Sequence, residues 1–392
     1  MLLIAGSGGV LQAEDIAIVK PGDYKVMISV AGFVTGGAPA ETLFLETLKR
    51  DLHLSGWFRL TAVANEGLQL SGRTSVNGNT LTADLRVVHP GDGKRYLVER
   101  YSGTDTRGLA HEVADAIVWA VKRKPGIASS RILLVGAAKG QQDLFVCDAD
   151  GQDVMRLTRD GAPCLAPSWG ATGQRVYYTS MVRRYPDVYR IDLRTNRRDR
   201  IANFPGLNTG AVESPDGSML ALTLSRDGNP ELYLRTVATG RLHRMTRTRA
   251  AEASPSWSPD GNQLVFVSDR SGRPQLYVVS RRGGDERRIT YEGSENVSPD
   301  WGPDGRIAYS SRQGGRYQIC TLTPGSGKPE QWTFDTADHE EPSWAPDGRH
   351  IAYAKTVSYR SAVYLLDTLK DPEVRLLLLE GDWYSPAWSR AK

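Results

Sequence analysis

The sequence predicts a mostly β protein: a C-terminal six-bladed β-propeller, preceded by a small α/β domain with two helices on a mixed sheet. A heptapeptide recurs, with its clearest copy, Pro-Ser-Trp-Ser-Pro-Asp-Gly, at residues 255–261. The positions equivalent to its tryptophan, 169, 213, 257, 301, 344 and 388, are 43 or 44 residues apart, which is typical of four-stranded propeller blades. The copy at 386–389 starts a repeat whose missing strands are expected at 131–158, so the ring closes without an open edge.

Residues 1–13 are small and apolar but lack a basic start, which predicts a weak or truncated signal peptide. Residues 14–130 lack the repeat and form the predicted α/β domain, and residues 131–392 form the propeller. In the first domain we expect strands at 25–30, 81–88 and 95–101 and helices at 40–54 and 107–124. Each helix has an apolar face, and Pro125 follows the second one directly.

Within each repeat, short β-branched and aromatic runs alternate with glycine-containing turns. After the copy at 255–261 the expected strands are 264–268, 275–279 and 288–290. The Pro-Asp-Gly piece suits a type I turn, and the tryptophan before it offers a large surface to bury between blades.

The charge balance does not indicate a nucleic-acid partner. The chain of 392 residues has 49 lysines and arginines against 45 acidic residues, a net charge of +4. Its basic groups fall in predicted hairpin turns without interleaved aromatic residues, so solvated loops are the simpler interpretation. The three cysteines, Cys147, Cys164 and Cys320, fall in or beside strands and are expected to be buried.

Catalytic and metal-binding motifs are incomplete in this sequence. It has no Gly-x-Ser-x-Gly element. His111-Glu112 begins like a zinc-protease helix, but Asp115 stands where the second histidine is required. Residues 148–153 are better explained as a hairpin turn than as a calcium loop. We therefore expect no enzyme activity, no metal and no cofactor.

The loops before each tryptophan are the stronger candidates, because propeller topology brings all six to one face around the central channel. The loop at 290–296 ranks first, since Tyr291 offers an amphipathic anchor and Glu292 and Glu295 offer complementary charge. The alternative is ordinary polar loops. The candidate residues on this face are Asn208, Glu252, Thr290, Tyr291, Glu292, Ser294, Glu295, Asn296, His339, Glu340 and Glu341.

A second candidate is the segment Glu14, Asp15, Ile16, Ala17, Ile18 and Val19. Its alternating isoleucines suit strand addition to a partner, and the alternative is a frayed terminus.

The order of these parts resembles the TolB family, the periplasmic component of the Tol-Pal system. The similarity covers 14–392 and includes Ala-His-Glu-Val-Ala-Asp at 110–115, Asp-Ala-Asp-Gly at 148–151 and Gly-Arg-Pro-Gln at 272–275. The stretch between 65 and 73 looks shortened against the family, as if part of a strand or turn were removed.

The resemblance implies a monomeric, non-enzymatic periplasmic scaffold. Pal, a lipoprotein of the outer membrane, would bind the loop face, and TolA would bind residues 14–19. Its role would be outer-membrane integrity and envelope constriction at division. The alternatives are an exported lyase-like or peptidase-like propeller enzyme, or a glycan- or solute-binding propeller, with the site at the central channel.

Overall fold

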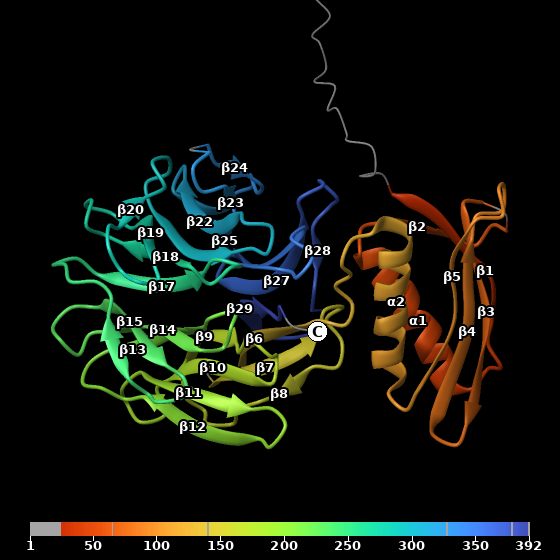
Figure 1. The fold of residues 1–392 in the computed structure, drawn as a ribbon, viewed down its shortest axis with the longest axis horizontal. Helices are drawn as coiled ribbons and strands as arrows, with labels where there is room; N and C mark the ends of the chain where they lie inside the picture. Colours follow the sequence, from red (N-terminus) through yellow and green to blue (C-terminus); the bar gives the residue numbers. More distant parts are fainter. Residues whose placement is uncertain (1–24, 65, 139–140, 327, 378, 391–392) are drawn as a thin grey trace, which may run out of the picture.

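The computed structural model describes residues 25–390 except 65, 139–140, 327 and 378. It shows a propeller and an α/β domain lying side by side (Figure 1). The expected signal peptide and the segment 14–19 lie outside the described residues. Neither described helix combines the length and the apolarity needed to cross a membrane.

The N-terminal domain is a mixed five-stranded sheet covered by two helices. The strand order is β2-β1-β3-β4-β5, with β1 parallel to β2 and β3 and the other pairs antiparallel. Both helices lie on the sheet face that points toward the propeller (Figure 1). The elements are β1 (Val26–Val34), α1 (Pro39–Leu54), β2 (Phe58–Thr61), β3 (Leu68–Asn77), β4 (Thr80–Val88), β5 (Arg95–Gly103) and α2 (Thr106–Lys122).

Two strands of this sheet were not expected. β2 has only four residues, and β3 buries Leu68 and Leu70 at its start but exposes most of its second half, so neither shows sustained alternation. The expected shortening at 65–73 does not interrupt the sheet, because β3 runs for ten residues through this stretch. α2 ends at Lys122 rather than 124, because Arg123 adopts a left-handed conformation with φ of 55°.

The propeller has six four-stranded blades, as predicted. Five are continuous in sequence. The first two are β9 (Cys164–Trp169), β10 (Arg175–Ser180), β11 (Asp187–Asp192), β12 (Arg197–Ala202), and β13 (Asn208–Glu213), β14 (Met219–Leu224), β15 (Glu231–Thr236), β16 (Leu242–Arg244). The third and fourth are β17 (Glu252–Trp257), β18 (Gln263–Ser268), β19 (Gln275–Ser280), β20 (Arg287–Arg288), and β21 (Asn296–Trp301), β22 (Ile307–Gln313), β23 (Arg316–Leu322), β24 (Glu330–Gln331). The fifth is β25 (Asp338–Trp344), β26 (His350–Val357), β27 (Arg360–Asp367) and β28 (Val374–Arg375).

The sixth blade joins the two ends of the repeat array and confirms the predicted ring closure. Its sheet order is β29-β6-β7-β8. The strands are β29 (Asp382–Trp388), β6 (Arg131–Ala138), β7 (Gln141–Asp148) and β8 (Met155–Arg156). Trp388 pairs with Ile132 in the sheet, and its indole N–H donates to the Ser130 hydroxyl at 2.7 Å.

The repeat tryptophans pack between blades, as expected. Trp257, Trp301, Trp344 and Trp388 are each less than 5 % exposed. The Trp257 indole donates to the carbonyl of Val212 in the preceding inner strand at 3.1 Å. This contact therefore ties two inner strands together across a blade boundary. All three cysteines are also buried, as predicted.

Candidate partner-binding site

The propeller has two chemically different ends. Because strands alternate in direction, the first-to-second and third-to-fourth connections of every blade share one end, here called the turn end. The second-to-third connections and the links between blades share the other, the loop end. The N-terminal domain contacts the turn end: Arg349 donates to the Gly56 carbonyl at 3.0 Å, and Arg107 donates to Asp150 at 2.8 Å. Among the described residues, the loop end is therefore left uncovered by this domain.

Large apolar side chains are exposed at the loop end. Phe334 is 76 % exposed and Tyr291 is 70 % exposed, both in links between blades. Tyr185 and Tyr359, in second-to-third connections, are 70 % and 98 % exposed. Exposed aromatic residues supply contact area at low entropy cost, which suits a binding surface.

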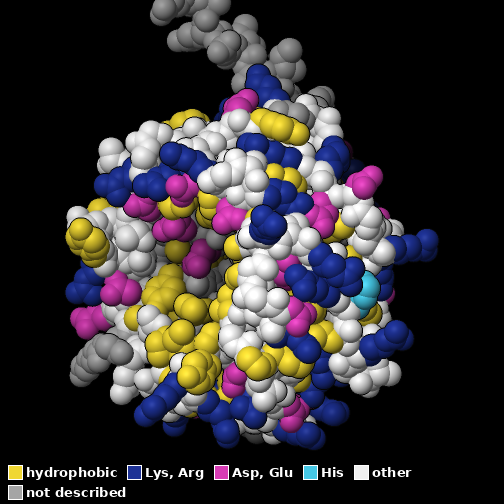
Figure 2. Space-filling view, turned by 90° about the vertical axis from the view of Figure 1, so that its left-hand side faces the viewer, with side chains coloured by type: hydrophobic (Ala, Val, Ile, Leu, Met, Phe, Trp, Pro, Cys, Tyr) yellow, Lys and Arg dark blue, Asp and Glu magenta, His cyan; other side chains and the backbone are white. Residues whose placement is uncertain are grey.

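Figure 2 shows one side of the molecule with a hollow that contains acidic side chains and is bordered by hydrophobic ones. Lysine and arginine side chains lie beside the hollow as well as at the edges of this view (Figure 2). Several of the basic residues at this end are paired with acids, as Arg312 is with Glu295 and Arg316 with Asp338, so the two signs of charge are interleaved over this surface.

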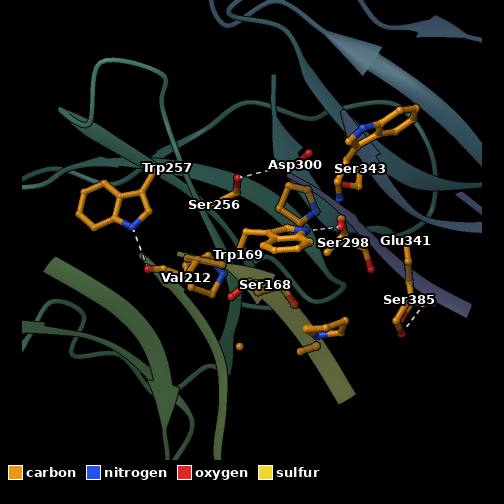
Figure 3. Close-up of a pocket in the computed structure, with 18 of the residues that line it drawn as sticks. Ser168, Trp169, Val212, Ser256, Trp257, Ser298, Asp300, Glu341, Ser343 and Ser385 are labelled. Carbon is orange, nitrogen blue, oxygen red and sulfur yellow. Dashed lines mark hydrogen bonds between the residues drawn. The ribbon is translucent and has the colours of Figure 1, made fainter. Parts of the chain in front are cut away.

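The central channel encloses about 620 Å³ and is lined by the six inner strands (Figure 3). Each inner strand carries a register shift, and three residues before the tryptophan position its backbone turns left-handed. Five of these positions hold small residues and one holds a glutamate: Ala166, Gly210, Ser254, Ser298, Glu341 and Ser385. The bulge thus places one residue per blade beside the channel.

Glu341 is the exception in this ring. Its φ is 55°, a conformation that costs about 1–3 kcal/mol for a residue other than glycine. Its carboxylate accepts hydrogen bonds from the N–H and the hydroxyl of Ser385, both at 2.8 Å (Figure 3), and burial raises its pKa. Because all six inner strands share the left-handed turn, what distinguishes Glu341 is a partly buried carboxylate bound by neutral donors, which makes it a candidate functional residue.

Asp300 lines the same channel but is neutralised. Its carboxylate accepts a hydrogen bond from the backbone N–H of Trp344 at 2.7 Å. Arg390, which follows the last strand, also donates to it at 2.7 Å. The channel carboxylates therefore differ, because Asp300 has a cationic partner at 2.7 Å and Glu341 is held by Ser385. A third, Glu213, also lines the channel and lies 3.9 Å from Arg175.

Five of the residues that were predicted to lie on the binding surface are buried, so the prediction that they are exposed is wrong. They are Asn208, Glu252, Asn296 and His339, each 0 % exposed, and Thr290, 3 % exposed. They support the loops from inside. Asn208 donates to the Phe204 carbonyl at 2.8 Å, and the Thr290 hydroxyl donates to Gln275 at 2.8 Å. The amides of Asn208 and Asn296 satisfy backbone carbonyls of the blade links, and none of the five side chains has free surface to offer.

The remaining candidates divide by exposure. Tyr291, Glu292 and Ser294 are exposed. Glu295 is partly buried and already paired, since Arg312 donates to it at 3.2 Å and the Tyr317 hydroxyl at 2.7 Å. Glu340 is partly buried, and burial raises its pKa.

Phe334 and Tyr359 were missed by the sequence analysis. Phe334 lies ten residues before Trp344, as Tyr291 lies ten residues before Trp301, so the repeat itself could have identified it. Tyr359 and Ser358 form the centre of a tight hairpin with φ of 63° and 48°. The usual Asn-Gly signal for such a turn is absent, and no sequence feature indicated it.

One cluster has the composition of a metal site. Ligand atoms of His111, Asp148 and Asp150 lie within 4.8 Å of one another. The Arg107 guanidinium stands among them, 2.8 Å from the Asp150 carboxylate and 3.0 Å from that of Asp148. A cation is thus already supplied by the protein, and this cluster belongs to the contact between the domains.

Comparison with known proteins gives consistent matches. A family model described as the TolB β-propeller domain matches residues 120–392. The Tol-Pal system protein TolB of Alcanivorax borkumensis is 34 % identical over 245 residues, 55 % of this chain and 56 % of the relative. That of Chromobacterium violaceum is 32 % identical over 232 residues, 53 % of each chain. The matched segment therefore spans about half the length of these curated relatives.

The crystal structure of TolB from Acinetobacter baumannii is similar over both domains. It superposes with a TM-score of 0.83 at 25 % identity, covering 94 % of this chain and 97 % of the other. The pairing of an α/β domain with a six-bladed propeller is therefore shared with a solved relative.

Proposed function

This chain belongs to the family of TolB β-propeller proteins, and on that premise we propose that it is a periplasmic, non-enzymatic component of a Tol-Pal system. Its curated relatives carry the name Tol-Pal system protein. The fold supplies a rigid ring with one end against a second domain and the other end free, which suits a scaffold that contacts more than one protein.

Pal binds at the loop end in this proposal. The observation that carries it is the concentration of exposed aromatic residues at the end that the N-terminal domain leaves free. Tyr291 and Phe334 supply anchors, Glu292 supplies exposed charge, and Glu341 supplies a partly buried carboxylate at the channel. Exposed aromatic residues, tyrosine among them, are enriched among the residues that contribute most interface energy.

TolA binds the segment 14–19 in this proposal, and the chain thereby connects layers of the cell envelope, notably at division. The alternation of Ile16 and Ile18 supports strand addition to TolA. The alternatives, an enzyme or a glycan-binding propeller acting at the channel, are less favoured because two of the channel carboxylates are already engaged within the chain, Asp300 by Arg390 and Glu341 by Ser385.

The test is calorimetric titration with purified Pal of four folded proteins: wild type, Tyr291→Ala, Glu292→Lys and Arg282→Ala. Arg282 is exposed at the turn end and is the matched control, whereas its neighbour Arg281 packs over the Trp257 ring and is less suitable. We expect the two loop-end variants to bind at least about tenfold more weakly, which corresponds to about 1.4 kcal/mol. Equal affinity in all four proteins would place Pal elsewhere.

A chain lacking residues 14–19 separates the two partners. It should lose binding to TolA while its affinity for Pal stays at the wild-type value. Retained TolA binding would refute the assignment of this segment and leave the Pal assignment to its own test.

A further inference from the structure

The two domains have separate hydrophobic cores. The core of the N-terminal domain draws its buried residues from positions 28–128. The propeller clusters draw theirs from 127 onward, starting with Ile127, which packs with Ala149 and Trp388. Each domain therefore buries its apolar surface within itself, and an interface of another kind must hold the two together.

That interface contains six charged side chains, here called the ionic junction. Arg50 and Asp51 come from α1, Arg107 and His111 from α2, and Asp148 and Asp150 from the end of β7 and its connection to β8.

The ionic junction is continuous across the domain boundary. His111 lies between two carboxylates, with Nδ1 2.7 Å from Asp51 and Nε2 3.2 Å from Asp148. Arg107 bridges Asp148 and Asp150 at 3.0 and 2.8 Å. Arg50 donates to the Asp150 carbonyl at 2.7 Å. Every propeller carboxylate in the junction thus receives a cation from the other domain.

Charge in the ionic junction is balanced, and three of its six side chains are buried. The side chains of Asp51 and Asp150 are 1 % exposed and that of His111 is 5 % exposed. With His111 protonated, three cations face three anions. Removing one member leaves a buried charge without its counterion, which is strongly destabilising in such networks.

A second contact repeats this chemistry at the neighbouring blade. The Arg349 guanidinium lies 4.1 Å from the centre of the Trp57 ring and donates to the Gly56 carbonyl, while also pairing with Asp367. Lys25 pairs with Asp371 at 2.6 Å. Both contacts between the domains therefore rest on cations and their partners.

We propose that the ionic junction is an electrostatic latch: breaking its charge balance lets the two folded domains separate and reorient as rigid bodies. Hydration of the freed charges favours the open state, and the buried apolar clusters among the described residues are separate in the two domains. The latch is a property of this fold and does not depend on which partners bind.

Protonation of His111 sets the alkaline limit of the latch. The groups facing it are Asp51 from α1, Arg107 from its own helix and Asp148 and Asp150 from the propeller. Burial alone would lower its pKa, but hydrogen bonds to Asp148 and Asp51 outweigh burial and raise the pKa to about 10. A raised pKa of a base gives stabilisation that is present at neutral pH and lost as the pH rises through that value.

Asp51 and Asp148, the two carboxylates bonded to His111, respond differently to pH. Burial raises the pKa of Asp51 to about 6, so its ionisation opposes closure above that pH and moderates the gain from His111. The pKa of Asp148 is lowered by its bonds to His111 and Arg107 despite burial, so its contribution is lost only on acidification. The latch is therefore expected to be closed at neutral pH and to open in alkali.

The experiment measures the distance between the domains in the full chain. Spin labels are placed on cysteines introduced at exposed Ser102 and Ala238, one in each domain, while the three native cysteines are buried. Distance distributions are recorded by pulsed electron resonance for wild type, Arg107→Ala, His111→Gln and Arg100→Ala. Arg100 pairs with Asp84 within one sheet and serves as the matched control.

We expect Arg107→Ala, and wild type in about 1 M salt, to shift or broaden the distribution by at least about 5 Å, as rigid-body rotations do, with unchanged far-ultraviolet circular dichroism. His111→Gln should be partly open at neutral pH and should not change further in alkali, whereas wild type should open there. A wild-type distribution in both junction variants and in high salt would overturn the proposal. Loss of secondary structure together with opening would overturn it as well, since the domains would then not be independently folded bodies.

Discussion

At the turn end of the propeller, buried charged side chains contact the N-terminal domain, whereas at the loop end aromatic side chains are exposed and that domain makes no described contact. Arg349 at the turn end is 7 % exposed, while Phe334 at the loop end is 76 % exposed. The difference teaches that residue type alone does not reveal which end binds a partner. Contacts between the two domains engage the charged side chains at the turn end, whereas the exposed aromatic side chains at the loop end remain available to a partner. Substitutions at the turn end should therefore change stability, and those at the loop end should change binding.

The largest expected effect comes from the tryptophan whose indole reaches the linker at the turn end. Trp388 is 3 % exposed and Trp119, on α2, is 54 % exposed. Trp388→Ala should lower the free energy of unfolding by about 3–5 kcal/mol, because it leaves a cavity and frees the Ser130 hydroxyl. Trp119→Ala, the same substitution at an exposed site, should change it by less than about 1 kcal/mol. Urea titration of both variants provides the measurement, and equal midpoints would show that β29 does not stabilise the ring.

Arg349→Ala tests the buried pairs of the turn end. The side chains of Arg349 and Asp367 are 8 % and 6 % exposed, so removing the cation should cost about 3 kcal/mol. The comparison is Arg316→Ala at the loop end, where the Arg316–Asp338 pair is 57 % and 24 % exposed and is expected to contribute less than about 1 kcal/mol. Similar losses in the two variants, measured by urea titration, would contradict the distinction between the ends.

Phe334→Ala should change binding and leave stability almost unchanged. The side chain is largely exposed, so the unfolding free energy should change by less than about 0.5 kcal/mol. Affinity for Pal, measured by calorimetry, should fall by about tenfold if this residue anchors the interface as Tyr291 does. If the variant loses stability but keeps its affinity for Pal, Phe334 does not belong to the binding surface.

Glu252→Gln sharpens the comparison, because Glu252 is a buried carboxylate near the loop end. Burial raises its pKa despite hydrogen bonds from Thr248 and Ser268, so its stabilising contribution is present only at low pH and declines as the pH rises through the raised value. The variant also loses the ion pair with Arg270, whose guanidinium lies 2.9 Å from the carboxylate. The prediction therefore concerns the stability difference from wild type, which should shift by about 1 kcal/mol in favour of the variant between pH 5 and pH 8. Chemical denaturation at both pH values provides the measurement.

Glu295→Gln is the control for that pH dependence. The pKa of Glu295 is lowered, chiefly by the Tyr317 hydroxyl, so its contribution is present at neutral pH and lost on acidification, which is the opposite sign. If the stability difference between Glu252→Gln and wild type does not shift toward the variant from pH 5 to pH 8, the raised pKa of Glu252 is refuted.

The fold was largely predictable because the information repeats. Six copies of one motif specify the turn, the buried tryptophan and the blade length, so errors in one degraded copy, such as that around Glu213, are corrected by the others. β2 and β3 had no second copy to support them, and tertiary pairing within the sheet overrode their weak local signals.

The site was less predictable, because a polar residue in a loop has the same sequence signature whether it faces solvent or the interior. Asn208 and Glu252 looked like surface groups and are buried supports. The role of His111 was equally hidden, because its partners Asp51 and Asp148 come from two other elements. Glu341 was named for its charge, whereas its left-handed backbone and its place beside the channel appear only once the bulges of the inner strands are seen.

Closure of the sixth blade has a consequence for biosynthesis. The strands β6, β7 and β8 are complete when the chain reaches Arg156, but β29, the strand that pairs with β6, begins only at Asp382. At 5–20 residues per second a ribosome needs about 10–50 s to cover that interval, and during this time β6 has an open edge that can pair with other chains. The ring can form only after translation of β29, so the nascent protein depends on protection of this edge. A substitution that slows docking of β29 should increase aggregation during synthesis even where the finished propeller is as stable as before.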